Sequence, residues 1–236
     1  KGNIALTKVD EDYPDNKLSG AVFEVYSDTN GDGKLDKDDT LLGEMKELDG
    51  GVYQMSELRF GKYLVKETKA PTGFVLDENV YSVSVEENGK TYTVENKAGV
   101  GFINAAQKGS LKIVKTSSDG KVEGFSFRVT GVDYDQTFKT DKNGEIVIEG
   151  LRIGDYTVSE VSNKASAGYI LPADKQATVK VDATAIVQMH NEFRDTPKTG
   201  DDFNLGLWVS LAALSVVGAG VLGFVGYKNR KKKKED

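Results

Sequence analysis

Three short blocks of sequence recur in the same order in the two halves of this 236-residue chain, and each contains one polar residue able to react. That residue lies in phase with apolar residues two or four positions before it, a spacing that places side chains on one face of a β-strand. The six residues are Lys8, Glu67 and Asn104 in the first half, and Lys115, Glu160 and Asn191 in the second. Each half is therefore expected to bury one amine, one carboxyl group and one side-chain amide.

Burial changes what these groups can do. It disfavours charge, so it lowers the pKa of a lysine and raises that of a glutamate, by up to about 3–5 units when burial is complete. A neutral amine can then attack the asparagine carbonyl while a neutral carboxylic acid polarises that carbonyl and relays protons. Ammonia leaves and an isopeptide bond forms, with Glu67 and Glu160 as catalysts acting only within their own domains. Because the groups are held in contact, the reaction is accelerated, since well-oriented intramolecular reactions reach effective molarities of about 10⁵–10⁸ M.

The elements that must position these groups are β-strands. Before the C-terminal region, alternating segments bounded by Gly, Asp and Asn recur throughout, and no long apolar stripe of helical period is found. The fold class is therefore expected to be all-β. Because the repeated blocks keep one order, we expect two homologous units, residues 1–107 and 108–193.

One segment of the first unit resembles a known family. Residues Tyr63–Phe74, YLVKETKAPTGF, resemble the E-box of the CnaB-type (SpaA-like, prealbumin-like) domains of Gram-positive pili and adhesins. The resemblance covers nearly all of residues 1–193. It implies two tandem reverse-Ig β-sandwiches of seven strands, with the lysine in the first strand, the asparagine in the last and the E-box glutamate as catalyst. The second unit departs from the pattern, because its segment Glu160–Tyr169 is longer and lacks the proline.

The C-terminal region is unlike the rest of the chain. An uncharged stretch from Leu205 to Tyr227 exceeds the roughly 20 residues that a helix needs to cross a bilayer. The following tail, residues 228–236, is rich in Lys and Arg. This composition places the tail in the cytoplasm and the folded units outside. Hydropathy alone would indicate a plain transmembrane anchor at residues 205–227.

A pentapeptide in the preceding linker, residues 194–204, indicates a different fate. It resembles the LPXTG cell-wall sorting signal, with Thr in place of the usual Leu, and consists of Thr196, Pro197, Lys198, Thr199 and Gly200. The resemblance implies that a sortase cysteine attacks the Thr199 carbonyl and releases residues 200–236. The enzyme would then pass Thr199 to an amine of the peptidoglycan precursor, so membrane attachment would be transient.

The first unit also contains an inserted acidic loop, residues 28–39, with the sequence DTNGDGKLDKDD. Oxygen-bearing side chains at alternating positions, with a glycine for the sharp turn, suit a calcium ion. The candidate ligands are Asp28, Asn30, Asp32, Lys34 through its backbone carbonyl, Asp36 and Asp39. The segment before the loop reads as a strand, so the paired helices of an EF-hand are not expected, and a solvated acidic turn is the alternative.

Composition excludes several classes of function. There is no cysteine and only one histidine, His190, so thiol chemistry is excluded and hydrolysis of external substrates is not expected. The chain is acidic, with a net charge of −6 although its last residues are strongly basic, and nucleic-acid binding is not expected.

These observations predict a structural stalk of a Gram-positive surface protein, covalently attached to the cell wall. A basal or minor pilin that joins other pilin subunits is the nearest alternative, and Tyr13–Lys17 weakly matches a motif whose lysine a sortase could link. A ligand-binding adhesin is another alternative, with its binding region for a host ligand, like the export signal, expected upstream of Lys1. The expected partners are sortase and the peptidoglycan precursor, and the only expected cofactor is calcium.

Overall fold

A computed structural model describes residues 1–194, and the regular structure in this part of the chain consists of β-strands. Within residues 1–194 no helix is long and apolar enough to span a membrane. The pentapeptide at 196–200, the apolar stretch at 205–227 and the basic tail lie outside the described residues.

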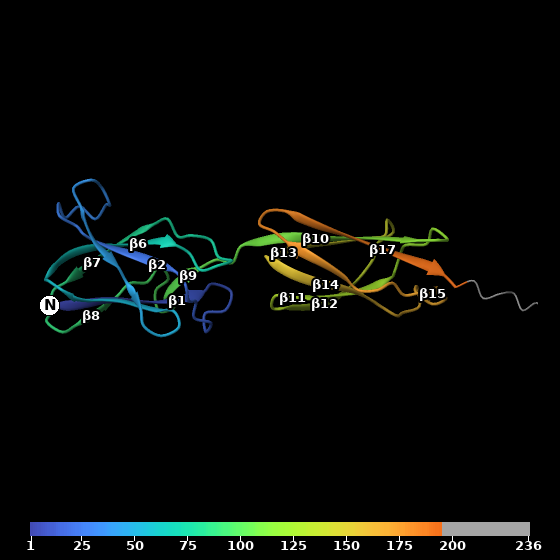
Figure 1. The fold of residues 1–236 in the computed structure, drawn as a ribbon, viewed down its shortest axis with the longest axis horizontal. Coiled ribbons are helices and arrows are strands. Elements are labelled where there is room, and N and C mark those ends of the chain that lie inside the picture. Colours follow the sequence, from blue (N-terminus) through green and yellow to red (C-terminus); the bar gives the residue numbers. More distant parts are fainter. Residues whose placement is uncertain (195–236) are drawn as a thin grey trace, which may run out of the picture. The chain divides into compact units, whose positions relative to one another are not determined.

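Residues 2–104 form the first sandwich (Figure 1). One sheet has the order β4-β5-β1-β8, with β9 also paired to β1, and the other has the order β3-β2-β6-β7. The strands are β1 (Gly2–Asp10), β2 (Val22–Ser27), β3 (Thr40–Glu44), β4 (Lys46–Glu47), β5 (Val52–Leu58), β6 (Gly61–Lys69), β7 (Val80–Val85), β8 (Thr91–Thr93) and β9 (Phe102–Asn104).

The core of the first sandwich follows from alternation along its strands. In β1, Ile4 and Leu6 are buried and the residues between them are partly exposed, as a strand with one covered face requires. Phe23 of the opposite sheet packs edge-to-face on Phe102, with ring centroids 5.0 Å apart. Each such apolar side chain contributes about 1.5–3 kcal/mol by leaving water. The buried face of β1 continues to Lys8, which lies in phase with the apolar residues.

Residues 108–193 form the second sandwich. Its sheets have the orders β13-β10-β17-β15 and β12-β11-β14-β16. The strands are β10 (Lys108–Ser117), β11 (Ser126–Gly131), β12 (Tyr134–Lys139), β13 (Glu145–Arg152), β14 (Gly154–Val161), β15 (Tyr169–Ile170), β16 (Lys175–Val179) and β17 (Thr184–Phe193). Leu111 and Ile113 of β10 are fully buried, and Lys115 follows them on the same face.

The two sandwiches differ in the last part of the chain that pairs with their first strand. In the second, β17 pairs in parallel with β10 without interruption from Ser110 to Ser117. In the first, β8 and β9 share β1 as their partner, and the chain leaves the sheet between them. Neither sandwich therefore has the seven uniform strands that the resemblance implies, because short additional strands are present.

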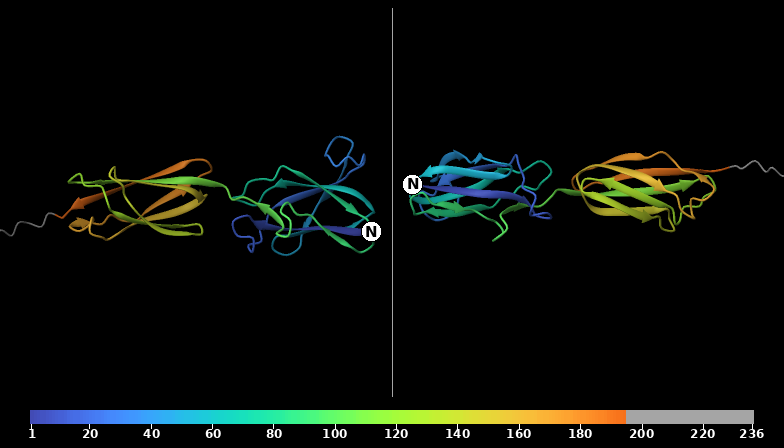
Figure 2. Two further views of the ribbon diagram at one scale, coloured as in Figure 1. Left: turned by 180° about the vertical axis from the view of Figure 1, so that it is seen from behind. Right: turned by 90° about the horizontal axis from the view of Figure 1, so that it is seen from below.

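The inserted loop of the first sandwich joins β2 to β3. It stands out from the strands in Figure 1 and in the left view of Figure 2. Its residue Gly33 has a φ of 77°, a conformation that a residue with a side chain rarely adopts.

Candidate cross-linking sites

The first sandwich brings the lysine, glutamate and asparagine predicted from sequence into one buried cluster. Lys8 comes from β1 and Asn104 from the neighbouring β9, whereas Glu67 comes from β6 in the opposite sheet. The parallel register pairs Lys8 with Phe102, so Asn104 lies two residues farther along and on the same face. Lys8 and Glu67 are completely inaccessible to solvent, and Asn104 is 3 % exposed.

The contacts in this cluster place the carboxyl group between the amine and the amide. Oε1 of Glu67 lies 3.8 Å from Nζ of Lys8 and accepts a hydrogen bond of 3.0 Å from Nδ2 of Asn104. Oε2 of Glu67 accepts a second bond from the same Nδ2 at 2.9 Å. Oδ1 of Asn104 is buried without a hydrogen-bond partner among the described residues. Such an oxygen is free to receive a proton or a hydrogen bond as charge develops on it.

Burial moves both titratable groups toward their neutral forms. Desolvation lowers the pKa of Lys8 to about 8, against the opposing charges of Glu67 and Asp77. Desolvation also raises the pKa of Glu67, although hydrogen bonds from Asp77 and Asn104 and the charge of Lys8 act in the other direction. The aromatic ring of Phe102, whose centroid is 5.0 Å from Nζ of Lys8, is part of the apolar surroundings. A neutral amine beside a carboxylic acid is thus accessible near neutral pH.

The second sandwich repeats this arrangement with fewer contacts. Asn191 of β17 donates a hydrogen bond of 2.7 Å from Nδ2 to Oε1 of Glu160 on β14. Oε2 of Glu160 and Oδ1 of Asn191 are both buried without a hydrogen-bond partner in the described part of the chain. Nζ of Lys115 donates to the backbone oxygen of Thr116 and lies 4.2 Å from the ring centroid of Phe125. Burial lowers the pKa of Lys115 and raises that of Glu160.

The acidic loop is organised by its own carboxylates. Oδ1 and Oδ2 of Asp28 accept hydrogen bonds from the backbone of Gly31 and Gly33, at 2.7 and 3.1 Å. Nδ2 of Asn30 donates to Asp36 at 3.3 Å, and the Asp32 carboxylate accepts from the backbone of Lys34 at 2.8 Å. Asp39 accepts from the backbone of both Thr29 and Asp36. In residues 1–194 no three acidic or histidine side chains gather closely enough to hold a metal ion, so calcium binding stays a prediction.

A polar network beside the first cluster was not predicted from sequence. The backbone N–H of Asp77 donates to Oε2 of Glu67 at 2.8 Å, and the Asp77 carboxylate accepts a bond of 2.8 Å from Nδ2 of Asn96. Both residues lie in loops, where no periodicity marks their direction. Only their contacts with strand residues identify them.

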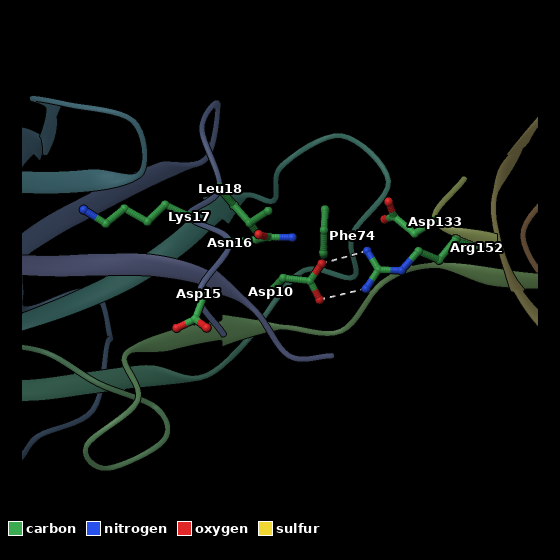
Figure 3. A pocket seen from close by; sticks show the side chains of 8 residues that line it. All are labelled: Asp10, Asp15, Asn16, Lys17, Leu18, Phe74, Asp133 and Arg152. Atoms are coloured by element: carbon green, nitrogen blue, oxygen red, sulfur yellow. Dashed lines mark hydrogen bonds and ion pairs between the residues drawn. The ribbon is translucent and has the colours of Figure 1, made fainter. Parts of the chain in front are cut away.

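An ion pair at the end of β1 was not predicted either. The Asp10 carboxylate accepts two hydrogen bonds from the Arg152 guanidinium, at 2.7 and 2.8 Å, and Figure 3 shows the two side chains facing each other. Burial is the largest single influence on Asp10 and raises its pKa, but the hydrogen bonds and charge of Arg152 together with backbone hydrogen bonds from Asp12 and Tyr13 hold that pKa below its ordinary value. Asp10 and Arg152 line a surface pocket, and Lys17 also lines it. The side chain of Lys17 is exposed and points away from the ion pair (Figure 3).

Comparison with known proteins identifies the family of these domains. The SpaA family, described as a prealbumin-like fold domain, matches residues 2–98 and 109–193. The chain belongs to this family. Its described part is therefore two tandem prealbumin-like domains, and the predicted SpaA-like character of both units is confirmed.

Solved structures share the fold of this SpaA-family chain. The Bacillus anthracis TIE protein is 24 % identical, with a TM-score of 0.60 over 82 % of this chain and 34 % of that one. The pilus adhesin SpaC of Lactobacillus rhamnosus GG is 14 % identical, with a TM-score of 0.51 over 81 % of this chain and 31 % of that one. A minor pilin of Streptococcus agalactiae is 18 % identical, with a TM-score of 0.37 over 85 % of this chain and all of that one. No curated protein matches the chain.

This chain thus spans about a third of the TIE protein and of the adhesin. At these identities the likeness to the TIE protein and to the adhesin establishes the fold alone.

Proposed function

We propose that this SpaA-family chain is a structural stalk of a Gram-positive surface protein, in which each prealbumin-like domain links itself covalently from its first strand to its last. The observation that carries the proposal is the buried contact of an amine, a carboxyl group and an amide in the first domain. In the second domain the same three residue types are buried, and the amide contacts the carboxyl group. A purely structural core gains nothing from such a cluster, because burying unpaired or ionisable groups costs several kcal/mol. A reaction that joins the amine to the amide removes the buried ionisable lysine from this cluster.

The reaction balances within the three side chains. Nζ of Lys8 attacks Cγ of Asn104, and a new N–C bond forms as the carbonyl electrons move to Oδ1. Glu67 lies next to both nitrogens as a neutral acid, so it delivers its proton to the departing Nδ2 and takes one from the attached Nζ as the carbonyl re-forms. The C–Nδ2 bond breaks, ammonia leaves, and Glu67 ends in its starting protonation state. Lys115, Glu160 and Asn191 have the same roles in the second domain.

Mass spectrometry tests this reaction directly. The folded chain should weigh less than its calculated mass by two molecules of ammonia, and Glu67→Ala and Glu160→Ala should each restore one. Tryptic digestion should yield two branched peptides, one joining Lys8 to Asn104 and one joining Lys115 to Asn191. The full calculated mass in well-folded protein would refute the cross-links and leave the fold assignment standing.

Attachment to the cell wall is the second part of the proposal and is supported by sequence alone. The pentapeptide, apolar stretch and basic tail occur in the order of a sorting signal. Wall fractions of a sortase-positive host should contain protein that ends at Thr199 and is released only by cleavage of peptidoglycan. Protein that stays extractable by detergent with residues 200–236 attached would contradict wall attachment.

A pilin subunit is the alternative that one observation favours. The exposed amine of Lys17, at the end of the Tyr13–Lys17 segment, is accessible to an enzyme that joins subunits. If the chain polymerises, Lys17→Ala should abolish sortase-dependent ladders on denaturing gels while Lys37→Ala, in the acidic loop, leaves them intact. A wild-type chain without ladders in a host with pilus sortases would exclude this role.

A further inference from the structure

In the first domain, hydrogen bonds from loop residues orient the reactive cluster, and the described residues of the second domain form no matching bonds to Glu160. In the first domain, both oxygens of Glu67 have hydrogen-bond partners, and one partner is the backbone N–H of Asp77 at 2.8 Å. In the second, Oε2 of Glu160 is buried with no partner in the described part of the chain. Since a carboxyl group with one unpaired oxygen is less constrained, the two glutamates differ in how firmly they are oriented.

The Asp77 side chain is anchored from several directions. One oxygen, Oδ1, accepts bonds from the backbone and side chain of Asn79, at 3.0 and 2.7 Å. The other, Oδ2, accepts from the hydroxyl of Tyr81 at 2.6 Å and from Nδ2 of Asn96 at 2.8 Å. Although burial opposes it, these bonds hold the pKa of Asp77 below its ordinary value. A side chain with this many partners fixes the position of its own backbone N–H, which is the group that contacts Glu67.

Asn96 connects this anchor to the strand that carries the reacting amide. Its Nδ2 donates to the backbone oxygen of Ile103 at 2.8 Å, and its Oδ1 accepts from the backbone N–H of Ile103 at 2.6 Å. Ile103 directly precedes Asn104. The loop after the E-box pairs with the same stretch of chain from the other side, through a bond of 2.9 Å from Val75 N–H to the Ala105 oxygen. The catalytic acid and the amide are therefore positioned by one continuous network.

The second domain has no equivalent of either residue for a reason visible in its sequence. Asp77 stands four residues after Gly73, and the residue four after the corresponding Gly168 is Pro172. Proline has no backbone N–H to donate. Asn96 lies in the loop that connects β8 to β9. In the second domain the single strand β17 takes the place of these two strands, so there is no such loop.

We propose that Asp77 and Asn96 are positioning residues for the cross-linking reaction of the first domain, and that their absence makes the second domain react more slowly. This inference rests on the proposed function. Neither residue exchanges atoms with the reactants, and both act by fixing Glu67 and Asn104. A displacement of about 1 Å at a reacting centre lowers a rate by about a hundredfold.

The test follows both cross-links in one molecule. The whole chain is synthesised in a short cell-free pulse and quenched in denaturant at intervals, and the two branched tryptic peptides are quantified by mass spectrometry. In the wild type, the Lys8–Asn104 peptide should appear before the Lys115–Asn191 peptide. In Asp77→Ala and in Asn96→Ala the first should slow by about 10–100-fold, with the second unchanged as an internal reference. Asp77→Asn keeps one of the two accepting side-chain oxygens, so it should recover part of the rate.

A matched control separates positioning from loss of stability. Asn3→Ala removes a side chain that accepts a hydrogen bond from the backbone N–H of Glu57 at 3.2 Å and donates one to Thr91 at 3.3 Å. Asn3 lies near the start of β1, five residues before Lys8. Asn3→Ala should leave both rates unchanged. A pH series adds a second readout.

Asp77→Ala keeps the backbone N–H of residue 77 but removes the side-chain bonds that hold it against Glu67. As this N–H moves away, Glu67 loses an influence that lowers its pKa and that is larger than the opposing influence of the Asp77 charge. The pKa of Glu67 should therefore rise, and the alkaline limb of the rate profile should move to higher pH in Asp77→Ala but not in Asn3→Ala. The facing groups, Lys8 on β1 and Asn104 on β9, are the same in both variants.

The outcomes distinguish the two proposals. If the wild-type chain cross-links, and Asp77→Ala and Asn96→Ala cross-link within about twofold of its rate, only the positioning role is overturned. A wild-type chain that keeps its full calculated mass would overturn the cross-linking reaction and this inference together. Equal rates for the two wild-type domains would overturn the predicted difference between them.

Discussion

The two prealbumin-like domains place the same three reactive groups with different degrees of support. Both keep the lysine and the asparagine on neighbouring parallel strands, with Lys8 opposite Phe102 and Lys115 opposite Met189. Around Glu67 every carboxyl oxygen is hydrogen-bonded, whereas Glu160 has one buried oxygen without a partner in the described part of the chain. The geometry that brings the reactants together thus belongs to the strand register. The geometry that orients the acid depends on loops that differ between the domains.

The largest effect is expected when the cross-link itself is prevented. Each proposed link would close most of a domain into a loop, and loop-closure reasoning for roughly 100 residues gives a stabilisation of about 4–5 kcal/mol. Glu67→Gln should lower the free energy of unfolding of the first domain by about this amount, and Glu160→Gln should do so for the second. Calorimetry of each variant measures the change, with the exposed Glu78→Gln and Glu123→Gln as matched controls. An unfolding temperature of the affected domain that does not change after loss of the link would contradict the loop-closure estimate.

A second substitution should reduce the difference in cross-linking rate between the two domains. Pro172→Ala supplies a backbone N–H at the position that corresponds to Asp77, so formation of the Lys115–Asn191 link should speed up by about tenfold or more. The pulse experiment with branched peptides measures this rate. Pro14→Ala, in an exposed segment of the first domain, is the control and should change neither link. An unaltered rate in Pro172→Ala would show that the unpaired oxygen of Glu160 does not limit the reaction.

A third prediction uses pH to compare a linked domain with an unlinked one. In Asn104→Ala, Lys8 stays a free buried amine whose folded-state pKa is about 8, below its ordinary value of 10.5. Between these values unfolding takes up a proton, so stability rises with pH and is lowest below the folded pKa. From pH 8 to about pH 9.5 the first domain of this variant should gain about 1–2 kcal/mol.

Denaturant titrations at several pH values measure this gain. The wild type should not show it, because the proposed link would convert Nζ of Lys8 into an amide nitrogen. The double variant Lys8→Met/Asn104→Ala should not show it either. A rise of the same size in the double variant would assign the effect to another group.

The smallest expected effect concerns the acidic loop, which only the first domain has. Calcium that binds the native state with a dissociation constant of about 10⁻³ M would add about 1 kcal/mol of stability at about 10 mM. Calorimetry with calcium and with chelator should shift the first transition and leave the second in place. Asp36→Asn should reduce the shift. A first domain indifferent to calcium would favour the alternative of a solvated acidic turn.

The sequence by itself determined the strands and the faces of the reactive residues. Because side chains alternate in a strand, the phase of Lys8 with Ile4 and Leu6 already predicts its burial, and the same count applies to Lys115. Repetition of the blocks then indicates two domains of one kind, as the matched family ranges confirm. These features are local, so spacing along the chain is sufficient to find them.

Only the tertiary structure decided which groups support the reaction. Asp77 and Asn96 lie in loops whose direction has no sequence period, and their partners Glu67 and Ile103 are distant in the chain. The same holds for Asp10 and Arg152, whose pairing depends on strands far apart in sequence. Hydrogen bonds of loop residues depend on the path of the backbone in three dimensions. The strand alternation that revealed the reactants therefore could not reveal the residues that orient them.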